Sequence, residues 1–145
     1  MPIGEFQYSV DDKGRVIIPP SFRDFVADGM VVTRGLDGCV YVYPLGIWSD
    51  IDKQLRSQSI YDPKARNFNR FFYSGASKVT LDSAGRVTLP QTLRSYAGIS
   101  DADNSVLIAG TPNHLEIWNE ARWNANLEAM QADLLVPESL MERIG

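Results

Sequence analysis

The chain has 145 residues, enough for one hydrophobic core or for two half-domains that share a core. Its 44% apolar and 22% charged residues are ordinary values for a soluble globular protein. No apolar run approaches the roughly 20 residues of a membrane-spanning helix, so no membrane partner is expected. The single cysteine, Cys39, excludes an internal disulfide and indicates a reducing cytoplasm.

A net charge of −4 argues against nucleic-acid binding, but the acidic excess is local. Residues 1–115 contain 12 basic and 12 acidic residues, whereas residues 116–145 contain 2 basic and 6 acidic ones. At physiological salt, screening limits the reach of a charge to about 8 Å. Any anion binding by the first 115 residues must therefore come from local basic patches.

The first half of the chain is predicted to contain two pairs of strands, each followed by a helix. Phe6, Tyr8 and Val10 recur at period two, and a turn containing Gly14 leads into a second alternating stretch. Pro19 ends that stretch because proline cannot donate to a β-ladder. In chain order, the predicted elements are strands at 6–10 and 16–18, a short helix at 21–26, strands at 30–33 and 40–43, and a helix along 45–55.

The second half of the chain begins after a connecting helix. Asp62 and Pro63 predict the start of that helix, as an N-cap and a first-turn proline, and Asn119 is a good N-cap for the last helix. Residues 131–145 show only a weak amphipathic pattern, which leaves a flexible tail and a partner-binding helix open. The other predicted elements are strands at 79–81 and 87–89, a short helix at 91–96, strands at 106–109 and 115–118, and a helix along 119–134.

The two halves repeat one another. Residues 10–19 return as residues 81–90, and each copy contains an Asp-x-x-Gly-Arg turn. The turns are 71 residues apart, whereas Gly35 matches Gly110 and Trp48 matches Trp123 at a separation of 75. The four additional residues are expected in a surface loop at 99–104. Each half is marginal alone, so this duplication is the main constraint on the fold.

The repeat predicts an α+β fold that is mainly β. Two ββαββ-type repeats can pair their strands about a pseudo-two-fold axis and close a β-barrel, which removes exposed sheet edges. We expect a first repeat at 5–57, a connecting helix at 58–76, a second repeat at 77–130 and an acidic C-terminal tail at 131–145.

Each Asp-x-x-Gly-Arg turn has the residues of an anion-binding loop. Gly14 and Gly85 permit the positive φ of a tight turn. Arg15 and Arg86 follow them, where a five-donor guanidinium can reach a phosphate or a guanine edge. The aspartate can accept hydrogen bonds from turn amides or orient the arginine. Alternatively, the Asp–Arg pair only pins the turn.

With these two turns, the chain resembles the MraZ family, bacterial regulators of the division and cell-wall gene cluster built from tandem SpoVT-AbrB domains. The resemblance covers about residues 3–130, and the tail beyond has no clear match. Besides the paired turns in this order, it rests on Gly4-Glu5-Phe6, Thr33-Arg34-Gly35-Leu36-Asp37-Gly38-Cys39, Tyr43-Pro44-Leu45, Phe71-Phe72-x-x-Gly75-Ala76 and Glu116-Ile117-Trp118.

The resemblance implies a swapped-hairpin, AbrB-like barrel and a sequence-specific transcriptional regulator without enzyme activity. It implies repeated promoter boxes of the protein's own operon as the target, an octameric or dodecameric ring, and a place in the cytoplasm at the nucleoid. It implies no metal, cofactor or small-molecule substrate. The residues that it assigns to double-stranded DNA are Asp11, Lys13, Gly14, Arg15, Asp82, Gly85 and Arg86, with Arg23 and Arg94 as supporting basic residues.

The two turns are not equivalent, because Lys13 in the first is replaced by Ala84 in the second. We expect the first turn to contact phosphate more strongly. His114 is the only histidine, so no His-based metal cluster or Ser-His-Asp triad can form, and a surface turn position is expected for it. Cys39 is expected to be a small packed residue.

Two regions leave alternatives open. Four aromatic residues at 68–73 exceed what one helix face needs, so part of them is expected at a subunit interface rather than in the core alone. Arg66 and Arg70 nearby are expected to be solvated, with DNA contact as the alternative. The acidic tail supports a second kind of function, an AbrB-type antitoxin-like module that binds a partner protein through residues 131–145. The aromatic residues are Phe68, Phe71, Phe72 and Tyr73.

Overall fold

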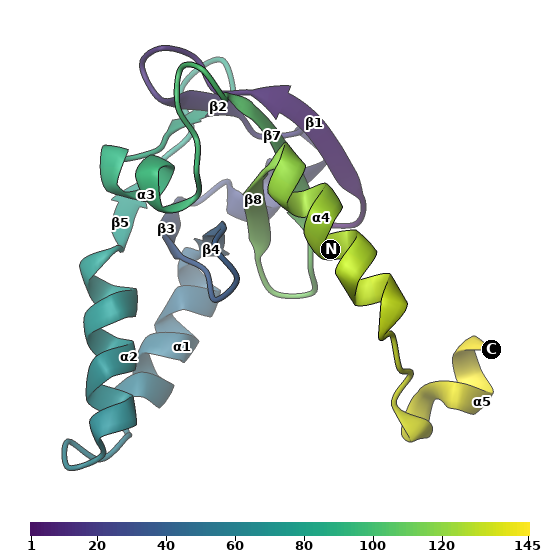
Figure 1. The fold of residues 1–145 in the computed structure, drawn as a ribbon. Helices are drawn as coiled ribbons and strands as arrows, with labels where there is room; N and C mark the ends of the chain where they lie inside the picture. Colours follow the sequence, from purple (N-terminus) through teal and green to yellow (C-terminus); the bar gives the residue numbers. More distant parts are fainter.

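Two antiparallel sheets and the helices that leave them make up the fold (Figure 1). The computed structural model describes residues 1–145. The strands are β1 (Glu5–Ser9), β2 (Arg15–Ile17), β3 (Met30–Arg34), β4 (Val40–Pro44), β5 (Ser77–Val79), β6 (Arg86–Thr88), β7 (Ser105–Gly110) and β8 (Leu115–Asn119). The helices are α1 (Leu45–Arg56), α2 (Pro63–Ser74), α3 (Gln91–Tyr96), α4 (Glu120–Ala132) and α5 (Met141–Ile144), with 3₁₀ turns at Pro20–Phe22, Asp24–Val26 and Glu138–Leu140.

Each sheet contains strands from both repeats. The larger sheet has six strands in the order β1-β7-β8-β4-β3-β5, and β2 pairs with β6 in a separate two-stranded ribbon. Thus β1 of the first repeat lies against β7 of the second, and β5 of the second lies against β3 of the first. Neither repeat completes a sheet alone. The expected α+β class is confirmed. The prediction that the fold is mainly β is wrong, because more residues lie in the five α-helices than in the eight strands.

The strand registers place a pseudo-two-fold axis through the molecule. In the ribbon, Val16 lies opposite Val87, which is its equivalent in the second repeat. In the large sheet, Tyr41 lies opposite its equivalent Glu116. The six-strand order also reads the same from either end once equivalent strands are exchanged. The axis therefore passes through the centre of the ribbon and between β4 and β8.

The registers correct one part of the repeat alignment. Met30 pairs with Pro44, and Val106 pairs with Asn119, so Met30 corresponds to Val106 at a separation of 76. The prediction that Gly35 matches Gly110 is therefore wrong, because Gly35 corresponds to Thr111. The reason lies in the hairpin turns, where three residues separate Gly35 from Cys39 but only two separate Thr111 from His114. The second repeat gains five residues before β7 and loses one at this turn.

One core joins the two repeats. Apolar side chains that face inward from the ribbon and from one face of the large sheet form a single buried cluster of 18 residues, which includes Val16, Val42, Val87 and Ile117. The other face of the large sheet carries Tyr41, Tyr43 and Trp118, and these pack with Phe72 of α2 and with half-buried residues of α1. The layers therefore run from the ribbon through the core and the large sheet to the helices.

The helices form where the caps predict them, with one difference between the repeats. The Asp62 side chain accepts a hydrogen bond from the Lys64 N–H at the start of α2, and Asn119 caps α4 through the Arg122 N–H. The short helix predicted at 21–26 consists of two 3₁₀ turns, whereas its counterpart α3 is α-helical. Val26 of the first repeat favours a helix less than its counterpart in the second repeat, Ala97.

The C-terminal segment beyond α4 lies outside the packed layers. Every residue from 128 to 145 is exposed, and α5 is a single short turn at the end of the chain. In Figure 1 this segment, drawn in yellow, extends away from the sheets on the side opposite the α1–α2 hairpin. None of the helices has the combination of length and apolar character that crossing a bilayer requires.

We predict that the shared core makes the two repeats unfold together. Leu89→Ala removes a fully buried side chain and should lower the free energy of unfolding by about 2–5 kcal/mol. Thr88→Ala, on the exposed face of the neighbouring position, should change it by no more than about 0.5 kcal/mol. Urea titrations followed by fluorescence and circular dichroism should coincide in one transition for both variants. Two separate transitions would contradict the shared core.

Candidate nucleic-acid interface

The first turn is closed by its own aspartate. Asp11 Oδ1 accepts hydrogen bonds from the backbone N–H groups of Lys13 (3.0 Å) and Arg15 (2.9 Å). Asp11 Oδ2 accepts a third hydrogen bond from Arg15 Nε at 2.7 Å. Gly14 completes the turn with φ of +79°, a conformation that favours glycine. The aspartate thus shapes the backbone and orients the arginine at the same time.

The second turn repeats this geometry closely. Asp82 Oδ1 accepts from the N–H groups of Ala84 (2.9 Å) and Arg86 (2.8 Å), and its Oδ2 accepts from Arg86 Nε at 2.8 Å. Gly85 has φ of +76°. The backbone hydrogen bonds of the two turns also match in position and length. Two sequences that share only the Asp, Gly and Arg therefore form the same turn.

Both aspartates are held in the ionised form. Hydrogen bonds from the Arg15 backbone and side chain, and from the Lys13 N–H, lower the pKa of Asp11 despite partial desolvation. The Arg86 N–H and guanidinium and the Ala84 N–H lower the pKa of Asp82 in the same way. Each carboxylate is therefore ionised at neutral pH and is a strong acceptor there.

Only one edge of each arginine is used within the chain. Arg15 and Arg86 donate through Nε to their aspartates, and their Nη1 and Nη2 groups donate no hydrogen bond inside the protein. Their side chains keep 29% and 33% of their surface accessible. If the Asp–Arg pair only pinned the turn, Nε would be sufficient. The four Nη groups of the two arginines would then bind no acceptor in the protein. They are positioned to bind an external acceptor.

Two further arginines reach across the pseudo-two-fold axis. Arg94 Nε donates to the Leu89 carbonyl, and the Arg94 guanidinium lies against Gly14 of the opposite repeat, where an added Cβ would be 2.7 Å from Nε. Arg23 donates to the Ile18 carbonyl and lies against Gly85 in the equivalent way. The structure thus brings all four predicted arginines together around the ribbon.

The outer face of the ribbon adds two residues that the motif did not indicate. Val16 and Val87 point into the core, so alternation turns the flanking positions outward. Ile17 is 37% exposed and pairs with Arg86. Thr88, its equivalent in the second repeat, pairs with Arg15. The Asp-x-x-Gly-Arg motif ends at the arginine and does not include these two positions, although period-two alternation predicts that they face outward.

The two sides of the ribbon differ in charge. Asp12 and Lys13 flank the first turn, where the second has Ser83 and Ala84. An open polar groove of about 670 Å³ lies beside the first turn, and its walls include Asp12, Arg94 and Asp101. The inserted residues of the second repeat, with Asp101, therefore lie next to the first turn. This acidic neighbour offsets the additional charge of Lys13.

His114 does not occupy the predicted surface position. Its side chain is only 15% exposed, its Nε2 lies 2.8 Å from Glu116 Oε2, and its ring is 4.4 Å from that of Tyr41. Burial raises the pKa of Glu116, but hydrogen bonds from His114 and Trp118 outweigh it and the net shift is downward. His114 and Glu116 are two residues apart, so the period-two alternation of a strand could have indicated that their side chains lie on the same face. Cys39 is fully buried, as predicted.

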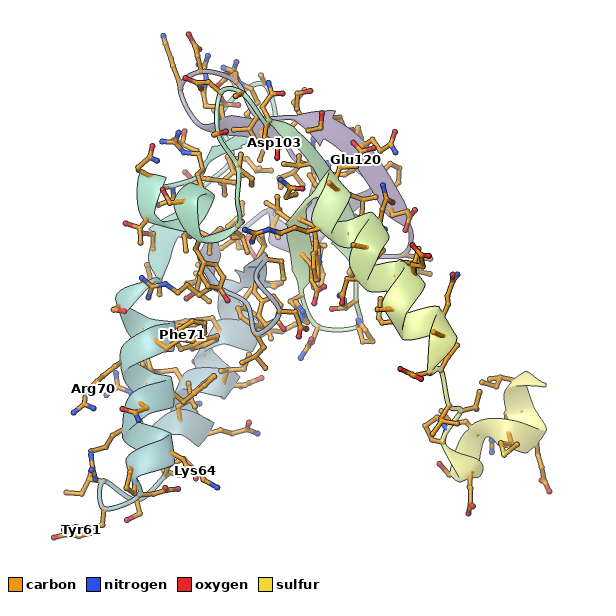
Figure 2. All side chains as sticks on the ribbon, viewed as in Figure 1. Tyr61, Lys64, Arg70, Phe71, Asp103 and Glu120 are labelled. Atoms are coloured by element: carbon orange, nitrogen blue, oxygen red, sulfur yellow. The ribbon has the colours of Figure 1, made fainter.

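The remaining candidates lie away from the ribbon. Arg66 and Arg70 belong to α2, where Arg66 Nη1 donates to the Ile60 carbonyl and Arg70 Nη1 to Asn67 Oδ1. Figure 2 shows Arg70 on the outside of the hairpin, at the end of the molecule opposite the ribbon. Of the aromatic cluster, Phe72 is buried, and Phe68 and Phe71 are half-buried. No group of three His, Cys, Asp or Glu side chains is placed to hold a metal ion.

The fold and the paired turns define a protein of two intertwined repeats with one cationic face built by both. A family model described as "MraZ protein, putative antitoxin-like" matches residues 1–71 and again residues 72–144. The chain therefore belongs to the MraZ family.

Relatives named transcriptional regulator MraZ are similar to the chain over its length. The prediction that the tail beyond residue 130 has no match in the family is therefore wrong. The protein from Thermus thermophilus is 52% identical over 145 residues, which is all of both chains. The protein from Deinococcus radiodurans is 50% identical over 140 residues, 97% of this chain and 96% of the relative. The protein from Halothermothrix orenii is 40% identical over 145 residues, 100% of this chain and 99% of the relative.

We predict that Gly14→Ala destabilises the protein through the turn. The positive φ costs alanine about 1–2 kcal/mol, and the new Cβ must displace the Arg94 guanidinium. Gly46→Ala is the control, because Gly46 lies in α1 with open space at its Cβ and should stabilise by about 0.4–1 kcal/mol. Urea unfolding measures both. Equal effects of the two substitutions would contradict the close approach at Gly14.

We predict that the contribution of Asp82 to stability depends on pH. A carboxylate whose pKa is lowered in the folded state stabilises the protein above its unfolded pKa, and this contribution is lost as the pH falls through the folded value, below 3.8. Asp82→Asn should therefore be less stable than wild type at pH 7, and the difference should shrink toward pH 3. Asp12→Asn, whose side chain makes no hydrogen bond in the chain, should track wild type at both pH values.

Proposed function

We propose that the chain is a DNA-binding transcriptional regulator that contacts double-stranded DNA with the ribbon β2–β6 and its two Asp-x-x-Gly-Arg turns. One observation carries the proposal. Four arginines, Arg15, Arg23, Arg86 and Arg94, are each fixed through Nε on one face, and their Nη groups have no acceptor within the chain. The names of the relatives, transcriptional regulator MraZ, support the same function.

Duplex DNA suits this face in shape and charge. An arginine held by one edge can donate two parallel hydrogen bonds to a phosphate or to the O6 and N7 atoms of guanine. A two-stranded antiparallel ribbon fits the major groove. In this proposal Arg15 and Arg86 contact base edges, and Arg23, Arg94 and Lys13 contact phosphates that set the register. Asp11, Asp82 and the two turn glycines hold these arginines in place.

The proposal also covers the architecture of the barrel and the assembly of several copies. The exchange of β1 and β5 between repeats supports a swapped-hairpin, AbrB-like barrel in which each repeat completes the other. We propose that several copies form a ring and bind repeated promoter boxes of their own division and cell-wall operon. Each copy then needs only a modest affinity for one DNA box, because the overall affinity of linked copies is much higher than that of one copy. The protein would act in the cytoplasm at the nucleoid and catalyse no reaction.

A second candidate function is an antitoxin-like module that binds another protein. It is favoured by the description of the matching family model and by the exposed C-terminal segment, residues 131–145. In this case deletion of the segment would abolish capture of a stoichiometric partner. DNA binding would then be secondary to that complex.

We predict that Arg15→Ala and Arg86→Ala each weaken binding to DNA from upstream of the gene by about 1–3 kcal/mol, roughly 5- to 150-fold. Each substitution removes the guanidinium but leaves the turn amides bonded to aspartate. Lys78→Ala removes one positive charge from β5, outside the ribbon and both turns, and should leave the affinity nearly unchanged.

The measurement is a gel-shift or anisotropy titration at two salt concentrations, with circular dichroism to check the fold. Affinity should fall steeply with salt because bound phosphates release counterions. Lys13→Ala should reduce the slope of log affinity against log salt concentration by about one, without changing the sequence preference. Wild-type affinity in the double variant Arg15→Ala/Arg86→Ala would overturn the proposed function.

A further inference from the structure

The α1–α2 hairpin presents a basic surface that the ribbon does not need. Residues 53–70 contain five basic side chains and one acidic side chain, Asp62. The hairpin projects from the sheets at the end away from the ribbon (Figure 1). Figure 2 shows Tyr61, Lys64 and Arg70 extending from it. DNA held at the ribbon would lie on the other side of the core, so these charges remain available for a different contact.

Apolar and unpaired polar atoms accompany these charges. Ile60 and Tyr61 at the hairpin tip are 73% and 84% exposed. A shallow groove of about 280 Å³ lies between the two helices and is lined by Leu55, Arg56, Asn69 and Tyr73. The Oδ1 atom of Asn69 is buried there without a hydrogen-bond donor. A buried acceptor is costly when unpaired, so the groove lacks one donor.

The C-terminal segment has the complementary properties. Between residues 128 and 145 there are four acidic side chains and one basic one, Arg143. Its large apolar side chains have no cover, since Leu134, Leu135, Met141 and Ile144 are between 56% and 88% exposed. Residues 134–137 belong to no helix or strand, so their backbone N–H groups are free to donate. Proline at position 137 is the exception.

The segment and the hairpin of one chain leave the sheets on opposite sides (Figure 1). One copy therefore offers an acceptor surface on one flank and a donor segment on the other. A contact between unlike surfaces of identical chains repeats from copy to copy, and it closes a ring when the rotation permits. The opposite charges of the hairpin and the segment favour a contact between these two unlike surfaces. A contact of two hairpins, or of two segments, would place like charges together.

We propose that residues 133–144 of one copy dock on the α1–α2 hairpin of a second copy. The acidic side chains of the segment face Lys53, Lys64 and Arg66, its apolar residues cover Ile60 and Tyr61, and a backbone N–H of residues 134–136 donates to Asn69 Oδ1. The inference specifies the interface of the self-association in the proposed function and rests on that part of it. It does not depend on DNA binding.

Two variants of the full protein test the direction of the contact. The first ends at Ala132 and lacks the segment. The second carries Lys53→Glu and Lys64→Glu, two exposed side chains without hydrogen bonds in the chain, so the fold should be unaffected. Sedimentation velocity should show assemblies for wild type and single chains for the truncated variant. The charge-reversed variant should need a concentration at least about tenfold higher for half-assembly.

The decisive sample is a mixture of the two variants. Each retains one intact half of the contact, the hairpin in the truncated chain and the segment in the charge-reversed chain. They should form a one-to-one complex that grows no further. Lys78→Glu, the same charge change on β5, serves as the control and should assemble like wild type. Circular dichroism and thermal melting check that every variant is folded.

Three results would overturn the inference. Wild-type assembly by the truncated chain would show that the interface lies elsewhere. Absence of the one-to-one complex in the mixture, with both variants folded, would exclude a contact between unlike surfaces. Single chains for wild type at all concentrations would remove the proposed self-association as well. The gel-shift titration separately decides the DNA-binding part of the proposed function.

Discussion

The pairing of β2 with β6 is the contact on which the rest of the molecule depends. Hydrogen bonds from Ile18 N–H to the Gly85 carbonyl (2.9 Å) and from Leu89 N–H to the Gly14 carbonyl (2.8 Å) extend this pairing into both turns. The pairing turns Val16 and Val87 into the shared core and the arginines outward. It also brings Arg94 to Gly14 and Arg23 to Gly85. Without it, each half would carry an open edge, an incomplete core and only two of the four arginines.

The aspartates make this cationic face possible at small energetic cost. A half-buried guanidinium that used all its donors within the chain would be rigid but unable to bind a ligand, and one with no partner would lose side-chain entropy on binding. A guanidinium held through Nε alone avoids both problems, because its side chain is already ordered and its Nη groups remain free to bind a ligand. The same carboxylate satisfies two turn N–H groups through its other oxygen. These bonds lower the pKa of Asp11 and Asp82, so both carboxylates are ionised at neutral pH.

Local patterns predicted most of the fold, and long-range pairing accounts for what they missed. Alternating apolar residues and the caps Asp62 and Asn119 indicate the strands and helices, because both signals act within a few residues. The repeat of Asp-x-x-Gly-Arg predicted two equivalent turns. The contact of Arg94 with Gly14 joins residues 80 positions apart and follows only from the ribbon register. The five-residue insertion before β7 likewise follows only from how the strands align.

The layered arrangement resolves the conflict between an acidic chain and a polyanionic ligand. The core cluster lies between the ribbon and the large sheet, and the helices cover the far face of that sheet. The acidic residues of the C-terminal segment lie outside these layers (Figure 1), and screening limits the reach of their charge to about 8 Å at physiological salt. A contact between copies through the helices and the segment would leave the ribbon face of every copy open. Self-association and DNA binding can then occur together, and the negative charge in residues 116–145 contributes to the first without opposing the second.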